Sequence, residues 1–342
     1  MDSDWGMRMI QRNSLLMLVK LIVCSISMSA VISAGAAQPA TDGAYPNRPV
    51  RWIVPFAPGA SNDLTARLFA SKMSDALGQQ FVIDNRGGAG GSIGAQLAAE
   101  AAPDGYTLLH ANPGPSVNNV IMRRKSPYQV TDFAPVMAIG YTPLWLFAAP
   151  KFPANSAREL LAYAKSNPGK LTWGSSGNGS SLHIGLALFA AATGLDIVHV
   201  PYKGTAPALT DVMSGRVDVM HTTIVSAESQ IKSGRIKVLA VAAPQRQAIM
   251  PNVPTLAEEG IKNAEATVWF GVQVAAKTPR SIVNLLNMHL NRIQQTPEVQ
   301  ARLDQLGLVK MGGSPEEFGQ FIKTETDKLK MLIKTKRIEM MD

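Results

Sequence analysis

The chain has 342 residues, of which 46% are hydrophobic, and a formal net charge of +8. This size suits two domains with real cores. Its single cysteine, Cys24, lies in the N-terminal segment, which excludes disulfides, thiolate metal sites and cysteine nucleophiles from the rest of the chain. No arginine or lysine cluster is interleaved with aromatic residues, so we expect no nucleic-acid partner, and the modest positive charge suits small acidic ligands.

Residues 1–36 are predicted to be a secretory signal peptide. Basic residues precede an apolar run over 15–32, and the small residues 34–37 follow it. A membrane anchor is the alternative, but Lys20 interrupts the run and leaves too few consecutive apolar residues for a comfortable span. Cys24 follows Val23, where a lipoprotein signal requires a small residue, so no lipid anchor is predicted. The segment therefore indicates an exported protein.

The first predicted structural unit is a strand over 50–54 followed by a helix. The strand is apolar and rich in β-branched residues, as is typical of a strand buried on both faces. Prolines end it, Gly59 permits a tight turn, and Ser61 or Asn62 can cap the helix. Such a loop presents free backbone N–H groups at a helix N-terminus, beyond the carboxyl edge of a sheet, where anions are favoured. A plain strand–helix connection is the alternative reading.

A second glycine-rich loop follows a strand predicted over 81–84. Gly88, Gly90 and Gly94 have the spacing G-x-G-x-x-x-G, which differs from the dinucleotide fingerprint. We therefore expect these glycines to permit a tight turn and close helix–strand packing, before a helix over 95–101. The next strand, over 107–110, leads into a polar loop over 111–116, which lies near the first loop if the sheet is parallel.

At this point the chain resembles the Bug family, the periplasmic solute receptors of tripartite tricarboxylate transporters. The resemblance runs in the family's order from residue 45 to the C-terminus. It is carried by Pro55-Phe56, Pro58-Gly59, Asp63, Asn85-Arg86, Gly88-Ala89-Gly90-Gly91, Pro103-Asp104-Gly105-Tyr106-Thr107-Leu108, Asp132-Phe133-Ala134-Pro135-Val136, His199-Val200-Pro201-Tyr202-Lys203-Gly204, Pro251-Asn252-Val253-Pro254-Thr255 and Trp269-Phe270-Gly271.

The rest of the chain alternates between strands and helices. Strands are predicted over 133–139, 144–149, 171–173, 197–200, 217–220, 236–242 and 267–275. Helices are predicted over 159–166, 182–192, 206–214, 255–259, 279–296, 297–306 and 315–337. The hydroxyl-rich loop over 174–181 repeats the strand–loop–helix design of the first unit, with a flexible surface loop as the alternative.

Catalytic motifs are missing from the sequence. The five histidines show no metal-ligand spacing, and no serine stands in a nucleophile elbow. A triad assembled only in space remains open at this stage. We predict no enzyme activity, no metal and no cofactor.

The resemblance implies an α/β fold of the two-lobe periplasmic-binding type (Venus flytrap, type II-like) with two hinge crossings. Lobe 1 is expected to combine 45–143 with 273–342, and lobe 2 to comprise 144–272, with hinges near 140–143 and 271–273. It also implies reversible capture of a small carboxylate in the cleft between the lobes and its delivery to membrane permease subunits. A periplasmic monomer is expected. The ligand-binding residues carried over from the family are Gly59, Ala60, Ser61, Asp63, Asn112, Ser116, Ser175, Gly177, Ser180, Ser181, His183, Lys203 and Thr222.

Two sequence features leave several classes of ligand possible. The charge of Asp63 would repel an anion, so it caps its own helix, holds a water or receives a ligand's ammonium group. Ala60 stands where many relatives carry a second adjacent glycine, which narrows the loop. Di- and tricarboxylates, acidic amino acids and aromatic acids all remain possible. The rival functions are a sensory receptor for a membrane kinase and a periplasmic hydrolase.

Overall fold

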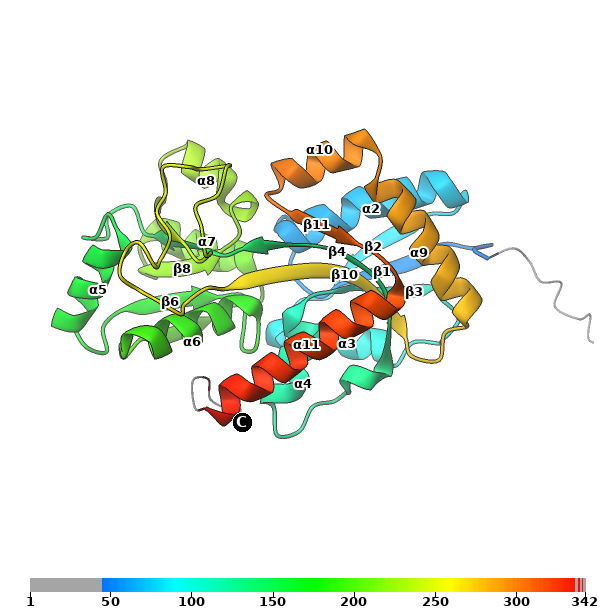
Figure 1. The fold of residues 1–342 in the computed structure, drawn as a ribbon, viewed down its shortest axis with the longest axis horizontal. Helices are drawn as coiled ribbons and strands as arrows, with labels where there is room; N and C mark the ends of the chain where they lie inside the picture. Colours follow the sequence, from blue (N-terminus) through cyan, green and yellow to red (C-terminus); the bar gives the residue numbers. More distant parts are fainter. Residues whose placement is uncertain (1–44, 336–337, 339, 341–342) are drawn as a thin grey trace, which may run out of the picture. The chain divides into compact units, whose positions relative to one another are not determined.

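The computed structural model of the protein describes residues 45–335, 338 and 340, so the signal peptide predicted over 1–36 lies outside the described residues. From Pro46 onward the chain forms one unit built on two mixed β-sheets (Figure 1). No helix within the described ranges is long and apolar enough to cross a membrane.

The first sheet has six strands. From edge to edge they are β11 (Val309–Gly312), β4 (Phe133–Pro143), β10 (Thr267–Ala275), β3 (Thr107–Ala111), β1 (Val50–Val54) and β2 (Phe81–Asn85). β1 is parallel to both β2 and β3, whereas β10 is antiparallel to β3 and β4. The loops that follow β1 and β3 therefore leave the same edge of the sheet, as the sequence predicted for a parallel pair.

The second sheet has five strands, in the order β7 (Val198–Pro201), β6 (Thr172–Ser175), β8 (Val219–Thr222), β5 (Trp145–Ala148) and β9 (Lys237–Val241). β6 is parallel to β7 and β8, and β5 is antiparallel to β8 and β9. The loops after β6 and β8 thus share an edge, in the same way as those after β1 and β3.

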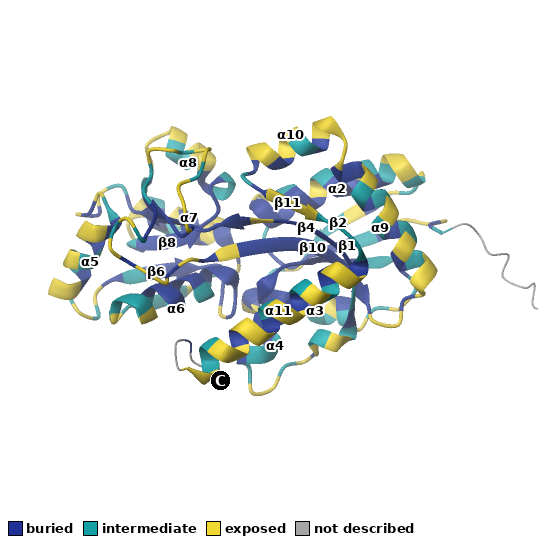
Figure 2. Cartoon of the chain, viewed as in Figure 1, coloured by how far each residue is buried: buried dark blue, intermediate teal, exposed yellow. Residues whose placement is uncertain are grey.

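Helices cover both sheets. Those of the first are α2 (Ser61–Leu77), α3 (Ser92–Ala99), α4 (Asn119–Met122), α9 (Arg280–Gln294), α10 (Pro297–Gln305) and α11 (Pro315–Lys334), with the short segments η1 (Ala89–Gly91), η2 (Gly114–Asn118) and η3 (Val130–Asp132). Those of the second are α5 (Ala157–Ser166), α6 (Ser181–Thr193), α7 (Thr205–Ser214), α8 (Glu228–Lys232) and η4 (Val225–Ala227). Figure 2 shows the long central strands β4 and β10 largely buried and the outer faces of the helices exposed, the arrangement expected of amphipathic helices on an apolar sheet.

The chain passes between the sheets twice, at Leu144 and at Ala266. These crossings lie side by side, because the Leu144 N–H donates to the Ala266 carbonyl at 2.8 Å. Both residues also hydrogen-bond to Ala242, which follows β9. The returning segment 267–275 therefore pairs with β4 from its first residue, Thr267 opposite Pro143.

Most predicted elements are present, but one predicted helix is wrong. Residues 255–259 form turns, because Thr255 bridges to Val241 and the Leu256 N–H donates to the Val241 carbonyl, which holds this backbone against β9. Seven elements were not predicted, namely the short segments η1, η2, η3 and η4, the helices α4 and α8, and the strand β11. The N-cap of α2 is Ala60, whose side chain makes no cap, rather than Ser61 or Asn62.

Candidate functional site

The two sheets present their polar loops to one another. The loops after β1 and β3 come from the six-stranded sheet, and the loops after β6 and β8 come from the five-stranded sheet. Between them lies a small cavity, called here the inner cavity, with a volume of about 10 Å3. Its lining residues are Phe56, Ser61, Asn62, Asn112, Ser176, Ser181, Leu182, Thr205, Thr222, Thr223 and Val268.

The chemistry of the inner cavity is polar and neutral. Hydroxyl and amide side chains alternate with three apolar ones, and none of the described side chains that line it carries a charge. Neutral hydroxyl and amide donors hold an anion by charge-assisted hydrogen bonds without the cost of burying a cation beside it. The cavity thus suits a small anion.

Asn112 and Asn62 form the polar wall on the side of the six-stranded sheet. The amide nitrogen of Asn112 donates to the Asn62 side-chain oxygen at 2.6 Å, and the Asn112 oxygen accepts from the Gly114 N–H at 3.0 Å. Both side chains are buried. The bond occupies the oxygen of Asn62, so the NH2 group of Asn62 is left as a donor.

Ser181 is the first residue of α6 and supplies the opposite wall. Its side-chain oxygen is buried and has no hydrogen-bond partner among the described residues. The preceding Ser180 is the N-cap, and its hydroxyl accepts from the His183 N–H at 3.3 Å. The N-terminus of a 13-residue helix and a free hydroxyl therefore lie at this wall, and the helix dipole favours negative charge there.

Asp63 is not among the residues that line the inner cavity, and its carboxylate holds the first loop together. One carboxylate oxygen accepts from the Gly59 N–H at 3.0 Å and from Arg67 Nε at 2.9 Å, and the other accepts from the Asn85 amide at 3.0 Å. Burial alone would raise the pKa of Asp63, but the three hydrogen bonds outweigh it and the pKa is lowered. The Gly59 N–H is thereby used within the loop, and Gly59 and Ala60 line a separate hollow beside α7.

The hydroxyl of Ser175 is likewise engaged inside the second loop. It lies 2.6 Å from His199 Nε2 and accepts from the Gly177 N–H at 3.1 Å. Ser175 is fully buried and is not among the residues that line the inner cavity. No sequence motif predicted this serine–histidine pair. The pair stabilises the loop and does not support the hydrolase alternative.

Other predicted site residues also lie away from the cavity wall. Ser116 is buried and donates to the side-chain oxygen of Gln273 at 2.7 Å, which ties the loop after β3 to β10. His183 accepts from the Gly179 N–H at 3.0 Å, and Lys203 is exposed. The structure thus brings Ser61, Asn112, Ser181 and Thr222 together at the cavity, and places the other predicted residues in the loops behind it.

Four polar lining residues were missed by the sequence analysis, namely Asn62, Ser176, Thr205 and Thr223. Each lies one or two residues from a predicted site residue or in the first turn of a predicted helix. The neighbouring predicted residues indicated these loops, but side-chain direction decides which members of a polar loop line the cavity.

The loops of the two sheets also touch outside the cavity. The Ser61 N–H donates to the Ser226 hydroxyl at 3.1 Å, which joins α2 to η4. A Cβ atom on Gly90 would lie 1.9 Å from the Asn178 carbonyl oxygen, and one on Gly177 would lie 2.8 Å from the Gly90 nitrogen. These glycines therefore allow the two loop sets to close on each other, in addition to the helix–strand packing predicted for Gly94, which lies against Pro55.

Residues 65–338 match the family model described as the tripartite tricarboxylate transporter family receptor. Among curated proteins, the chain is 38% identical to the UPF0065 protein in the tcbD-tcbE intergenic region of Pseudomonas sp. (strain P51), over 91% of this chain and 93% of that protein.

Three solved structures share the fold. An R. palustris protein solved with adipate is 35% identical, with a TM-score of 0.82 over 85% of this chain and 98% of that one. The periplasmic binding protein BugD is 33% identical, with a TM-score of 0.82 over 86% and 99%. MatC from Rhodopseudomonas palustris, solved with malate, is 33% identical, with a TM-score of 0.79 over 83% and 98%. The two sheets described above are thus the two lobes of a periplasmic-binding fold.

Proposed function

Because the chain belongs to the tripartite tricarboxylate transporter receptor family, we propose that it captures a small organic carboxylate and delivers it to the membrane permease of such a transporter. The observation that carries the proposal is the inner cavity, where the N-terminus of α6 and the unpartnered Ser181 hydroxyl face neutral amide and hydroxyl groups. Capture needs no bond to be made or broken, and the solved relatives are solute-binding proteins.

The ligand carboxylate accepts hydrogen bonds from the Ser181 hydroxyl and the first N–H groups of α6 on one side. On the other side it accepts from the Asn62 and Asn112 side chains. Hydrogen bonds to a charged group contribute about 1.5–3 kcal/mol each, so three strong ones supply about the 8 kcal/mol of micromolar binding. Malate and adipate, seen in two relatives, belong to the same carboxylate class.

The lobes are proposed to close on the ligand. Lobe 1 is the part built on the six-stranded sheet and lobe 2 the part built on the five-stranded sheet, with hinges at the crossings near Leu144 and Ala266. Both lobes line the inner cavity, so a ligand there interacts with both only when they are together, which favours the closed state. The site of action is proposed to be the periplasm, where the permease meets its receptor, and the receptor is proposed to act as a monomer.

A thermal-shift screen with malate, adipate, citrate, aspartate and nicotinate tests the capture. An acid at a hundred times its Kd should stabilise the folded state by about 2.7 kcal/mol. Ser181→Ala removes the free hydroxyl and should weaken binding about tenfold or more, whereas Ser229→Ala, on α8 and outside the inner cavity, should not. The proposal fails if no carboxylate binds.

Delivery is tested separately in the native host. Deleting the gene should abolish uptake of the acid found in the screen, and the wild-type gene should restore it while Ser181→Ala does not. Uptake that continues without the gene would contradict the transport role and leave the binding result standing.

A further inference from the structure

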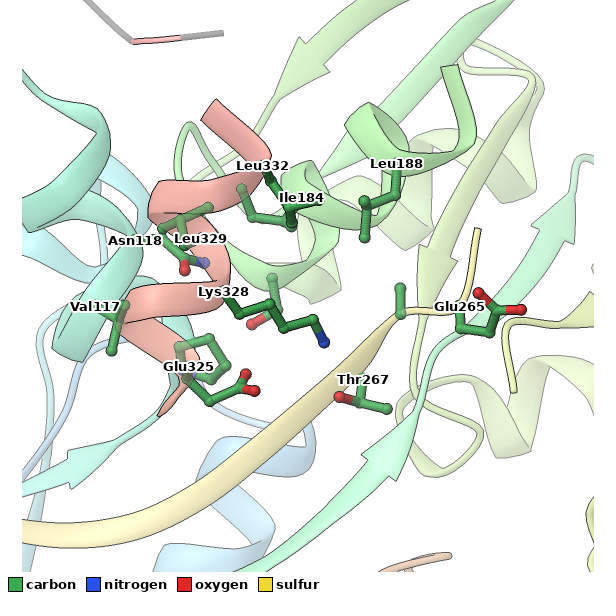
Figure 3. Close-up of a pocket in the computed structure, with 13 residues that line it drawn as sticks. Val117, Asn118, Ile184, Leu188, Glu265, Thr267, Glu325, Lys328, Leu329 and Leu332 are labelled. Carbon is green, nitrogen blue, oxygen red and sulfur yellow. The ribbon is translucent and has the colours of Figure 1, made fainter. Parts of the chain in front are cut away.

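A second hollow opens between α6, α11 and η2, and is called here the outer hollow (Figure 3). Its volume is about 60 Å3. Residues from both lobes line it, since α11 and η2 belong to the part with the six-stranded sheet and α6 to the part with the five-stranded sheet. Ser181, the first residue of α6, is the one described residue that lines both this hollow and the inner cavity. The two spaces therefore meet at a single side chain.

The outer hollow contains two buried polar groups that lack partners among the described residues. They are the hydroxyl of Ser181 and the side-chain nitrogen of Asn118, whose residues are 6% and 5% exposed. Unpaired buried donors are uncommon, because each costs free energy that a hydrogen bond recovers. Ser181 belongs to lobe 2, whereas Asn118, the last residue of η2, belongs to lobe 1. A polar partner between these two groups satisfies both and joins the lobes.

Water fits the outer hollow better than an ion does. One water needs a cavity of about 10–15 Å3, which the outer hollow exceeds. The charged lining residues are Lys328, Glu265 and Glu325, and two carboxylates against one ammonium group disfavour an anion. The free nitrogen of Asn118 donates hydrogen bonds and cannot coordinate a cation. Figure 3 shows Glu265 on the opposite side of the hollow from Asn118, which leaves this amide to a water.

We propose that Asn118 is a positioning residue for the solute, which acts on the hydroxyl of Ser181 through a water in the outer hollow. The inference rests on the proposed function, because Ser181 is the hydroxyl that binds the ligand carboxylate there. The water contacts both lobes only when they are together, so it also favours the closed state.

The direction of the hydrogen bonds explains the effect on binding. A serine hydroxyl donates one hydrogen bond and can accept two. The water accepts from the Asn118 amide, which can only donate, and then donates to the oxygen of Ser181. The Ser181 proton is thereby turned toward the inner cavity and the ligand carboxylate. Each bond of such a chain polarises the next, which strengthens the last one.

A double-mutant cycle measured by calorimetry tests this inference, with malate, adipate, citrate, aspartate and nicotinate as probes. Asn118→Leu replaces the amide with an apolar group of similar size, and should weaken the binding of each acid that the wild type binds about fivefold. In the Ser181→Ala background the same substitution should change the Kd less than about twofold, because the hydroxyl on which Asn118 acts is missing.

Stability distinguishes this role from a structural one. Removing an unpaired buried amide should leave the midpoint of urea unfolding unchanged or raise it, so Asn118→Leu should lose affinity without losing stability. Val117→Ala is the matched control, because Val117 also lies in η2, lines the outer hollow and is 1% exposed, but has no polar side-chain atom. The control should lower the midpoint and leave the Kd within about twofold.

A crystal structure of the wild type with a bound acid gives a test that does not depend on the variants, and it decides alone should Asn118→Leu not fold. It should show a water within about 3.2 Å of both Asn118 Nδ2 and Ser181 Oγ.

The inference is overturned if no water bridges these two atoms or if Asn118→Leu binds the acids as tightly as the wild type. It is also overturned if Asn118→Leu weakens binding equally with and without the Ser181 hydroxyl, or lowers the unfolding midpoint as Val117→Ala does. Each of these outcomes leaves carboxylate capture standing, whereas a wild type that binds none of the five acids overturns both proposals.

Discussion

The imidazole rings of His183 and His199 lie face to face, with centroids 4.2 Å apart and planes 3° from parallel. His183 is in the first turn of α6 and His199 is in β7, so the stack joins the start of the helix to the sheet. Burial lowers the pKa of His183 to about 4, with a further contribution from His199, and burial lowers the pKa of His199 as well. Both rings are therefore neutral at pH 7, which allows them to stack without repulsion.

Replacing His183 with leucine should loosen the loop before α6. The substitution removes the ring nitrogen that accepts from the Gly179 N–H. A lost hydrogen bond of this kind costs about 1 kcal/mol, so amide exchange at Gly179 should accelerate about fivefold, as measured by NMR. The same substitution at His289, on α9, leaves this bond in place and serves as the control. Unchanged exchange at Gly179 would show that the ring does not hold the loop.

Acid should destabilise the protein through His110 and His221. Both are fully buried without hydrogen-bond partners among the described residues, and burial lowers the pKa of each to about 3, against a slight opposing effect of Asp63 on His110. In the unfolded chain a histidine takes up its proton near pH 6.5, so below that pH the unfolded state binds more protons than the folded state. The free energy of unfolding should therefore fall by about 1.4 kcal/mol per pH unit for each residue as the pH drops from about 6 toward 3.

His110→Phe isolates one of these contributions. His110 lies between the rings of Trp52 and Phe270, at centroid distances of 6.2 and 5.9 Å, so phenylalanine suits the site. The free energy of unfolding, measured with urea between pH 6 and pH 4.5, should depend on pH less steeply in this variant than in the wild type. The difference between the two slopes should be about 1.4 kcal/mol per pH unit. Equal slopes would mean that the folded state accepts the proton at His110.

Gly90→Ala should hold the two lobes apart. Its Cβ would meet the Asn178 carbonyl oxygen at 1.9 Å, a distance that only movement of one loop can relieve. Gly78→Ala is a matched control, because Gly78 has nearly the same φ, +67° against +64°, and no atom within 4 Å of an added Cβ. Both variants should lose similar stability from backbone strain. Only Gly90→Ala should increase the radius of gyration, measured by X-ray scattering, and weaken carboxylate binding, measured by calorimetry. Equal behaviour of the Gly90→Ala and Gly78→Ala variants would refute the contact between Gly90 and Asn178.

Asp63→Asn should disorganise the first loop. The side chain of Asp63 is 4% exposed, and its carboxylate accepts from the Gly59 N–H, Arg67 and Asn85. An amide keeps one acceptor oxygen, so a buried group loses its partner at a cost of about 1–3 kcal/mol in the free energy of unfolding. Asp75→Asn, at an exposed position of the same helix, should cost less than about 0.5 kcal/mol. A loss at Asp63 no larger than that at Asp75 would contradict this role.

The regular parts of this fold could be predicted from the sequence because their patterns are local. The apolar run at 50–54 and the segment 267–275 are strands, and the family resemblance identified both the receptor family and the two-lobe fold. The helix expected over 255–259 failed because Thr255 pairs with Val241, a contact that no local pattern shows. β11 was missed because its residues are mostly exposed, so that it lacks the alternation of a half-buried strand.

The sequence predicted which loops surround the cavity, but not which side chains of those loops line it. Gly59 and Ser175 are predicted ligand groups, and in the structure the Gly59 N–H donates to Asp63 and the Ser175 hydroxyl lies 2.6 Å from His199 Nε2. Asn62 was read as a helix cap, yet it lines the inner cavity with Asn112. Which polar atom remains free depends on partners that are distant in the sequence, and these appear only once the chain has folded.

The position of β10 has a consequence for how the protein reaches its folded state. β10 lies between β3 and β4, although it follows the whole five-stranded sheet in the chain. Until it has been synthesised, β2, β1 and β3 can pair only among themselves, and β3 keeps an unpaired edge. Contacts between segments so far apart slow folding, because loop closure must precede the gain from pairing. A nascent chain that ends before residue 267 thus cannot complete the six-stranded sheet.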